Sequence, residues 1–121
     1  MELTGRKLGN WGEDQAVDYL QKHGVVILGK NIFTEYGEID LLGVKENTLL
    51  FIEVKTSRTR KYGFPEVSVT ARKMEHMNKA AQKYIQDHDE LSQDWRIDVV
   101  SIEVDSRNKS EIRWFENVVN E

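Results

Sequence analysis

The chain has 121 residues, of which 39% are hydrophobic and 31% charged, a composition typical of one globular domain with a single core. No apolar run approaches the roughly 18 residues that a membrane-spanning helix needs, and the first residues lack the apolar segment of a secretory signal. Because there is no cysteine, disulfides and thiolate metal sites are excluded, and we expect a cytoplasmic protein with no membrane partner.

Hydrophobic periodicity predicts a first helix over residues 4–23. Three segments rich in β-branched residues follow at 25–33, 38–44 and 48–56, and we expect each to be a strand. The turns between them are short, which favours an antiparallel meander. One stripe of the helix carries Glu13, Ala16, Val17 and Leu20.

A loop is expected from Ser57 to Ser68, and a second helix over residues 70–88 with Thr70 as its N-cap. Its apolar stripe would be Met74, Met77, Ala81, Tyr84 and His88. Strands are then expected at 96–104 and 112–119. The third strand, second helix and fourth strand have the lengths of a right-handed βαβ crossover, which makes those two strands parallel. The sequence therefore predicts an α/β fold of order αβββαβ, with a mixed central sheet flanked by helices.

Two segments with charged residues inside apolar strands stand out as a candidate site. Glu53 and Lys55 lie two residues apart in the third strand, so they share one face of it. Asp40 stands between two apolar residues of the second strand. A charge in such a strand is costly to bury unless it is paired or binds something. If the two strands form a hairpin, Asp40 approaches Glu53 and two carboxylates converge beside a lysine.

This pattern suits Mg²⁺, which is held by one or two carboxylates and keeps waters for a substrate phosphate. A metal held by Asp40 and Glu53 would activate water and polarise a phosphodiester. Lys55 would position or deprotonate that water, or stabilise developing negative charge. The same residues also fit an inert ion pair at a sheet end, and the sequence alone leaves both interpretations open.

Glu13 is a further candidate, because a glutamate on the buried stripe of a helix is unusual. It would be a second metal ligand, orient a ligand, or reach solvent from the edge of the stripe. Gly9 and Gly12 lie on or beside the same side of the helix and would let the backbone approach a neighbour closely.

The formal net charge is −4, but basic residues gather in one part of the chain. Residues 55–83 hold eight Lys or Arg against two Glu, a local charge of +6. Arg58, Arg60 and Lys61 follow the candidate lysine directly, where phosphate contact and a solvated loop are both reasonable interpretations.

The motifs resemble those of the YraN-like family of uncharacterised proteins over about residues 9–102. The resemblance is carried by Gly12-Glu13, Asn31, Gly37-Glu38-Ile39-Asp40 and Phe51-Ile52-Glu53-Val54-Lys55, with weaker matches at Gly63-Phe64-Pro65, Lys73 and Arg96-Ile97-Asp98. That family is similar to archaeal Holliday-junction resolvases and to the PD-(D/E)xK, restriction-endonuclease-like fold.

The resemblance implies one nuclease-like domain over residues 1–121, with Mg²⁺ or Mn²⁺ held by Asp40 and Glu53. It implies that Lys55 is catalytic and that Glu13 is the helix carboxylate of the site. It also implies a homodimer acting on branched DNA. The expected nucleic-acid contacts are Arg58, Arg60, Lys61, Arg72 and Lys73.

Three functions remain to be distinguished. The first is a metal-dependent endonuclease that hydrolyses DNA phosphodiester bonds. The second is a nucleic-acid-binding or DNA-repair accessory module that keeps the fold without cutting. The third is a structural domain with an inert ion-paired site, which would show no salt-dependent affinity for DNA.

Overall fold

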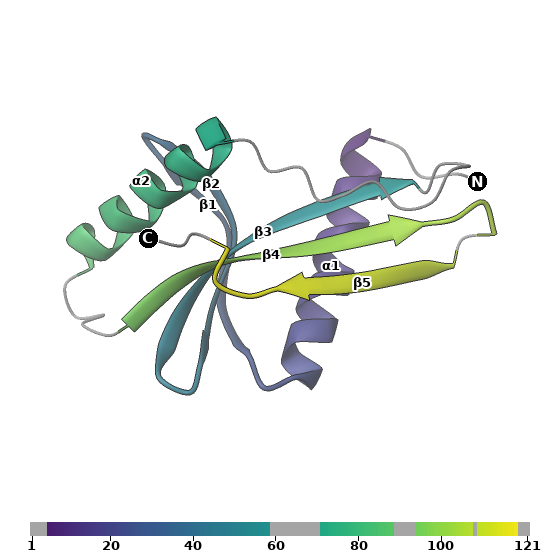
Figure 1. The fold of residues 1–121 in the computed structure, drawn as a ribbon, viewed down its shortest axis with the longest axis horizontal. Helices are drawn as coiled ribbons and strands as arrows, with labels where there is room; N and C mark the ends of the chain where they lie inside the picture. Colours follow the sequence, from purple (N-terminus) through teal and green to yellow (C-terminus); the bar gives the residue numbers. More distant parts are fainter. Residues whose placement is uncertain (1–4, 59–70, 89–93, 108, 119–121) are drawn as a thin grey trace.

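The computed structural model describes residues 5–58, 71–88, 94–107 and 109–118. In chain order the elements are α1 (Gly5–Lys22), β1 (Val26–Thr34), β2 (Gly37–Lys45), β3 (Thr48–Arg58), α2 (Ala71–Asp87), β4 (Asp94–Val104) and β5 (Ser110–Phe115). The strands form one sheet in the order β1-β2-β3-β4-β5 (Figure 1). Neither helix of this described part is long and apolar enough to cross a membrane.

The sheet is mixed, as predicted. The pairs β1–β2, β2–β3 and β4–β5 are antiparallel, whereas β3 and β4 are parallel. The parallel pair comes from the crossover through α2, and the antiparallel pairs follow from the short turns. This α/β arrangement confirms the restriction-endonuclease-like αβββαβ core expected from the sequence, with β5 added at the edge.

Several predicted boundaries were wrong. Ser57 and Arg58 belong to β3 and not to a loop, because both continue the parallel pairing with β4. The Ser57 hydroxyl also donates to the buried Glu103 of β4, at 3.1 Å. The last strand begins at Ser110 and ends at Phe115; Asn117, with φ of 52°, adopts a left-handed backbone that a strand cannot continue. Thr70, the predicted N-cap, lies outside the described residues.

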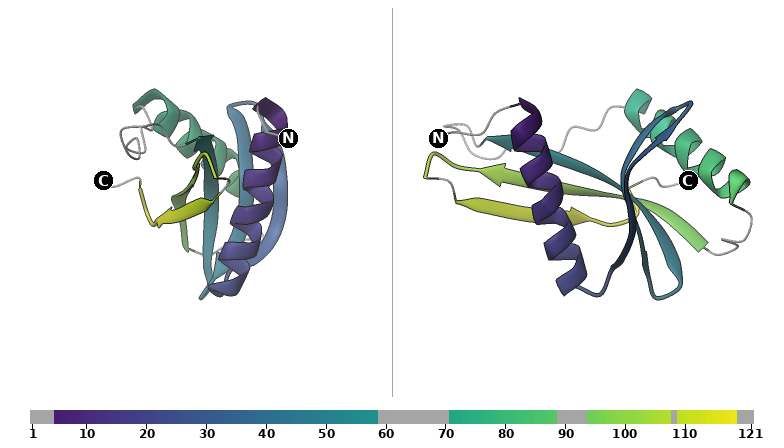
Figure 2. Two further views of the ribbon diagram at one scale, coloured as in Figure 1. Left: turned by 90° about the vertical axis from the view of Figure 1, so that its right-hand side faces the viewer. Right: turned by 180° about the vertical axis from the view of Figure 1, so that it is seen from behind.

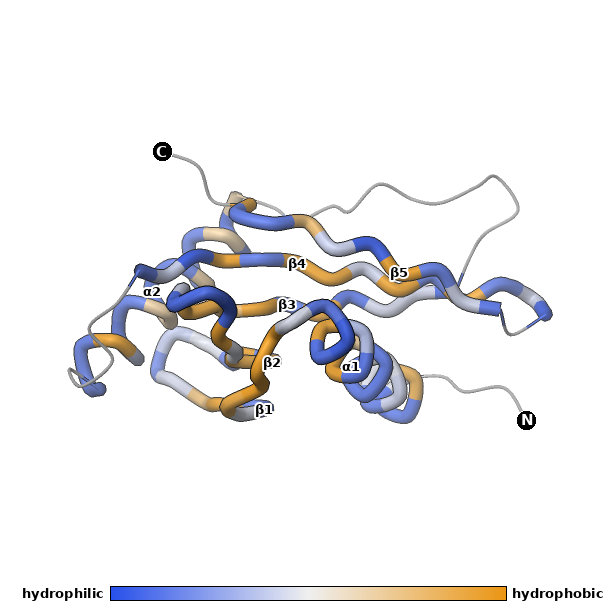
Figure 3. Tube along the Cα trace, turned by 90° about the horizontal axis from the view of Figure 1, so that it is seen from below, coloured by the Kyte–Doolittle hydropathy of each residue, from blue (hydrophilic) through white to orange (hydrophobic). Residues whose placement is uncertain are grey.

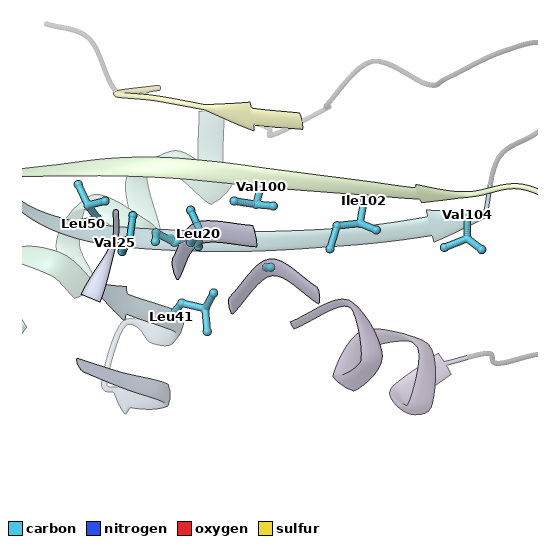
Figure 4. Close-up of a cluster of buried hydrophobic side chains, with 9 residues drawn as sticks. Leu20, Val25, Leu41, Leu50, Val100, Ile102 and Val104 are labelled. Carbon is cyan, nitrogen blue, oxygen red and sulfur yellow. The ribbon is translucent and has the colours of Figure 1, made fainter. Parts of the chain in front are cut away.

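The two helices cover opposite faces of the sheet (Figure 2). Hydrophobic stretches run along β2, β3 and β4, while much of each helix is hydrophilic (Figure 3). The core under α1 includes Ala16 and Leu20, two residues of the predicted stripe (Figure 4). Its members are Ala16, Leu20, Val25, Leu41, Leu50, Ile52, Val100, Ile102 and Val104.

The core under α2 is separate and smaller. Its buried members are Ile39, Leu42, Leu49, Phe51, Ala80, Ala81 and Ile97. From the predicted stripe of α2, Ala81 is fully buried, and Met77 and Tyr84 pack against the cluster. Each helix is therefore fixed to the sheet by its own apolar contacts.

Gly12 determines how closely α1 approaches β3. A Cβ atom at this position would lie 1.8 Å from Oγ1 and 2.8 Å from Cβ of Thr56, so only glycine fits. The predicted close approach is therefore confirmed at Gly12. It is wrong at Gly9, where a Cβ would meet no atom within 4 Å. The contact with Thr56 brings the next residue of α1, Glu13, toward the sheet.

A buried carboxylate joins β4 to β5. Asp98 is 0% exposed, yet its oxygens accept hydrogen bonds from four groups. The donors are Nε and a terminal nitrogen of Arg96 at 3.0 and 3.2 Å, Nε1 of Trp114 at 2.8 Å and the backbone N–H of Asn117 at 2.8 Å. These bonds compensate the desolvation of the carboxylate and hold the last strand in place.

Candidate metal centre

The site begins where β2 and β3 separate. Their antiparallel pairing ends at Leu41 opposite Ile52, and the next residue of β2 toward its start is Asp40. Beyond this point a side chain replaces the backbone partner: Oδ2 of Asp40 accepts a hydrogen bond from the N–H of Val54 at 2.9 Å. The bond fixes the Asp40 carboxylate at the fork between the two strands.

Three carboxylates meet at this fork. One oxygen each from Glu13, Glu38 and Asp40 lies within 4.8 Å of the other two. Glu38 and Asp40 are two residues apart in β2, so the strand projects both toward the same face. Glu13 comes from α1, which Gly12 allows to lie close to β3. Residues far apart in the chain are thus brought together by a hairpin and a closely packed helix.

Asn31 of β1 links two of these carboxylates. With its amide nitrogen turned toward them, it donates to Glu38 Oε2 at 2.8 Å and to Glu13 Oε1 at 3.2 Å. Its backbone has φ of 52°, a left-handed conformation that asparagine adopts more readily than most residues. Asn31 therefore meets both a backbone and a hydrogen-bonding requirement of the site.

The crowding of negative charge changes the acidity of the site. Burial, followed by the charge of Glu53, raises the pKa of Asp40 to about 7, although the Val54 hydrogen bond opposes the shift. Burial also raises the pKa of Glu13, and the hydrogen bond from Asn31 opposes that shift. These carboxylates would be stabilised in their charged form by a bound cation.

Glu53 lies on the α2 side of the site and has a cationic partner. Nζ of Lys73 is 2.9 Å from Glu53 Oε2, and the Glu53 side chain is only 16% exposed. This hydrogen bond is the main cause that raises the pKa of Lys73. Glu53 is near enough to Asp40 to raise the pKa of Asp40. It does not belong to the group of three carboxylates that Asp40 forms with Glu13 and Glu38.

The remaining predicted site residues that the structure describes lie on β3 and α2. Lys55 is exposed on β3, two residues after Glu53. Arg58 ends β3 and is half-buried, and Arg72 is exposed in the first turn of α2 beside Lys73. Arg60 and Lys61 lie outside the described residues. The start of α2 therefore brings Lys73 to Glu53, beside the acidic fork.

The donor set fits a hard divalent cation. All three groups are carboxylates, the ligands that Mg²⁺ and Mn²⁺ prefer. Ligand oxygens on opposite sides of a Mg²⁺ ion are about 4.2 Å apart, twice the bond length. Oxygens already within 4.8 Å of one another need only small side-chain adjustments to reach that spacing. Glu13, Glu38 and Asp40 are thus the residues that would hold the ion, with Glu53 adjacent.

Glu38 was not among the ligands that the sequence suggested. The signal was present, because Glu38 precedes Asp40 by two residues and strand alternation places both on one face. An exposed glutamate beside a turn is common, however, and the pattern alone does not distinguish it from a solvated residue. Only the position of α1 shows that Glu38 faces another carboxylate.

The chain is similar in sequence to known bacterial proteins. Residues 12–102 match a family described as "Uncharacterised protein family UPF0102". A UPF0102 protein of Syntrophomonas wolfei is 44% identical over 107 residues, which cover 88% of this chain and 92% of the relative. One of Caldicellulosiruptor bescii is 42% identical over 106 residues, covering 85% and 87% of the two chains. One of Dichelobacter nodosus is 36% identical over 118 residues, covering 98% and 93%.

The family match runs from within α1 to within β4, and it includes all three carboxylates of the fork. It confirms the resemblance that the motifs around Asp40 and Glu53 suggested. The chain belongs to the UPF0102, or YraN-like, protein family.

Proposed function

We propose that this protein is a divalent-metal-dependent endonuclease that hydrolyses DNA phosphodiester bonds, with branched or junction DNA as its preferred substrate. The observation that carries the proposal is the convergence of Glu13, Glu38 and Asp40 within 4.8 Å. Two lysines of neighbouring elements, Lys55 of β3 and Lys73 of α2, supply the positive charge that phosphate chemistry requires.

Glu13, Glu38 and Asp40 would hold Mg²⁺ or Mn²⁺. The bound ion supplies Lewis acidity toward a phosphate oxygen and a nucleophilic water at neutral pH. Asp40 is oriented for this task by the Val54 N–H, and Glu13 and Glu38 by the Asn31 amide. Because the ligands are already fixed, little reorganisation is needed when the substrate binds.

Lys55 has two roles open to it on β3. Its ammonium stabilises the charge that develops on the phosphate, or its amine accepts a proton from the attacking water. In the overall step an oxygen–phosphorus bond forms from water and an ester oxygen–phosphorus bond breaks. The leaving oxygen takes up a proton, so one strand end carries a phosphate and the other a hydroxyl.

Contacts to the DNA backbone would come from the basic residues around the fork. Arg58, Arg72 and Lys73 lie at the end of β3 and the start of α2, and Arg60 and Lys61 are part of the same proposal. Such contacts release counterions, so the affinity should fall steeply as salt rises. Cutting both strands of a branch needs two sites, so the proposal includes a homodimer, which sedimentation velocity tests.

A cleavage assay tests the activity directly. Labelled single-stranded, duplex, flapped and four-way-junction DNA would be incubated with Mg²⁺ or Mn²⁺, with RNA controls. The wild type would be compared with Asp40→Asn and with Asp18→Asn, which changes an exposed aspartate of α1 and is purified identically. We expect cleavage by the wild type and by Asp18→Asn, and a loss of at least about a hundredfold in Asp40→Asn.

Two outcomes would contradict the proposal. Cleavage that persists in Asp40→Asn would mean a contaminating nuclease or a different site. Tight, salt-dependent DNA binding without cleavage of any substrate would instead favour a binding or DNA-repair accessory module on the same fold.

A further inference from the structure

Phe33 is the most exposed large hydrophobic residue among those that the structure describes. Its exposed fraction is 78%, compared with 60% for Val26 and 50% for Leu28 on the same strand. A phenylalanine ring left in water does not gain the favourable free energy of removing its apolar surface from water. Phe33 stands next to the three-carboxylate fork, and this position suggests what would cover the ring.

The register of the β1–β2 hairpin places Phe33 beside the site. Phe33 is directly opposite Glu38 in this antiparallel pair. Opposite residues project from the same face of the sheet with Cβ atoms about 5 Å apart. Glu38 in turn lies within 4.8 Å of Asp40 and Glu13, measured between carboxylate oxygens. The exposed ring and the group that would hold the metal are therefore neighbours.

The end of the hairpin is held by local hydrogen bonds. The Thr34 hydroxyl donates to the carbonyl of Gly37 at 2.7 Å and accepts from the N–H of Tyr36 at 3.1 Å. On the other side of Phe33, Ile32 packs against the core under α2. The backbone that carries Phe33 is thus anchored on both sides, and the ring is presented from a defined position.

We infer that Phe33 stacks on an unpaired base of the DNA, next to the phosphate held at the fork. This inference rests on the proposed nuclease function and specifies its substrate. Within a continuous duplex each base face is covered by its neighbours, so a ring can stack only where a base is unpaired or at an end. The contact would therefore select single-stranded, flapped or junction DNA over continuous duplex.

A second copy of the chain is a less suitable partner for this ring. A two-fold interface brings the same patch of both copies together. Glu35 and Glu38 flank Phe33, so such an interface would place like charges against each other near the two rings. With a cation at the fork, by contrast, a phosphate and its base fit the same surface.

Binding measured by fluorescence anisotropy in the presence of Ca²⁺ tests the inference. The probes are a single strand of about 12 nucleotides, the corresponding duplex, and the same strand without bases. The variants are Phe33→Ala, Phe33→Trp and Leu28→Ala, the last a control at another exposed apolar position of β1. Circular dichroism would establish that all variants are folded.

We expect Phe33→Ala to weaken binding of the single strand roughly 5- to 150-fold, the range found for stacking on one aromatic residue. Binding of the base-free strand should not change, and binding of the duplex should change much less than that of the single strand, because only its two ends offer an open base face. Phe33→Trp should keep the affinity, and Leu28→Ala should behave as the wild type. Removing the ring and removing the bases should each weaken binding. Because both remove the same contact, Phe33→Ala should bind the base-free strand no more weakly than the wild type does.

Several results would overturn the inference. They are equal binding by Phe33→Ala and Leu28→Ala, an equal loss of affinity for duplex and single strand, or a change of oligomeric state in Phe33→Ala alone.

Failure of the proposed function looks different: the predicted binding pattern would be present without cleavage by the wild type. If the wild type cleaves and Phe33→Ala selects substrates as Leu28→Ala does, only the stacking inference fails. If the wild type binds no DNA, both fail.

Discussion

The ammonium of Lys73 lies 2.9 Å from a carboxylate oxygen of Glu53, so a side chain of α2 neutralises the charge of Glu53 beside the candidate metal centre. A divalent cation at the fork would compete with this ammonium for the same negative field. The ion pair is partly exposed, which limits its contribution to stability. Its main effect is therefore expected on the affinity of the site for cations.

Replacing Lys73 should strengthen metal binding. In Lys73→Met the charge of Glu53 acts more strongly on a cation at the fork, and we expect the Kd for Mn²⁺ to fall roughly 3- to 10-fold. Isothermal titration calorimetry measures this change. Lys79→Met is the matched control, because it removes the same charge from an exposed position of α2. Equal effects of the two variants would show that only net charge matters.

The raised pKa of Asp40 predicts a dependence of stability on pH. Its pKa is about 7 in the folded chain and near 3.8 in an unfolded one. Between these values only the folded state holds the proton, so this group contributes stability at low pH and loses it as pH rises through about 7. A shift of this size corresponds to roughly 4 kcal/mol at most.

Asp40→Asn removes this pH dependence and keeps an oxygen for the Val54 N–H. Relative to the wild type, the variant should gain on the order of 2 kcal/mol in unfolding free energy between pH 5 and pH 8. Urea denaturation in the presence of a chelator measures the gain. A difference between the two proteins that is constant with pH would contradict the assignment.

Two glycines of α1 should respond to alanine in opposite ways. At Gly12 the added methyl group would overlap Thr56, so Gly12→Ala should destabilise the fold by about 1–3 kcal/mol. It should also weaken metal binding, because Glu13 moves with the helix. At Gly9 the space is open, and Gly9→Ala should stabilise the helix by about 0.5–1 kcal/mol. Thermal unfolding and Mn²⁺ titration of both variants check these signs.

The buried Asp98 is expected to be important for stability and not for chemistry. Asp98→Ala leaves Trp114 and the Asn117 N–H without their acceptor and Arg96 with only Glu116, at 3.5 Å, and it should cost about 3–5 kcal/mol. Asp94→Ala, at an exposed position of the same strand, should have little effect. Urea denaturation distinguishes the two, and similar small losses would mean that other acceptors replace Asp98.

Much of the fold could be predicted because each element carries its own periodic signal. Short apolar runs bounded by turns located β2 and β3, and helical spacing located Ala16 and Leu20. The end of β3 was missed, since Ser57 and Arg58 are polar and their place in the sheet depends on pairing with β4. A pairing partner more than forty residues away leaves no trace in the local pattern.

The site was predictable to a smaller extent. Asp40 could be recognised because a carboxylate between apolar residues of a strand is unusual. The role of Glu38 depends on where α1 packs, and the pairing of Glu53 with Lys73 depends on where α2 begins. The position of each helix relative to the hairpin depends on contacts between segments that are far apart in the chain. The sequence of one segment therefore does not predict it.

The hydrogen bonds of Asp98 also bear on where the folding unit ends. The family model covers residues 12–102, but Trp114 and Asn117, which complete the hydrogen bonds of Asp98, follow it. The N–H of Val118 also returns to the carbonyl of Ile97, at 2.8 Å. A fragment ending at residue 102 would keep all three carboxylates of the fork. It would lose the hydrogen bonds that Trp114 and Asn117 donate to the buried Asp98. The family model is thus shorter than the stretch that must fold together, whereas the match with the Dichelobacter nodosus relative, which covers 98% of this chain, extends further.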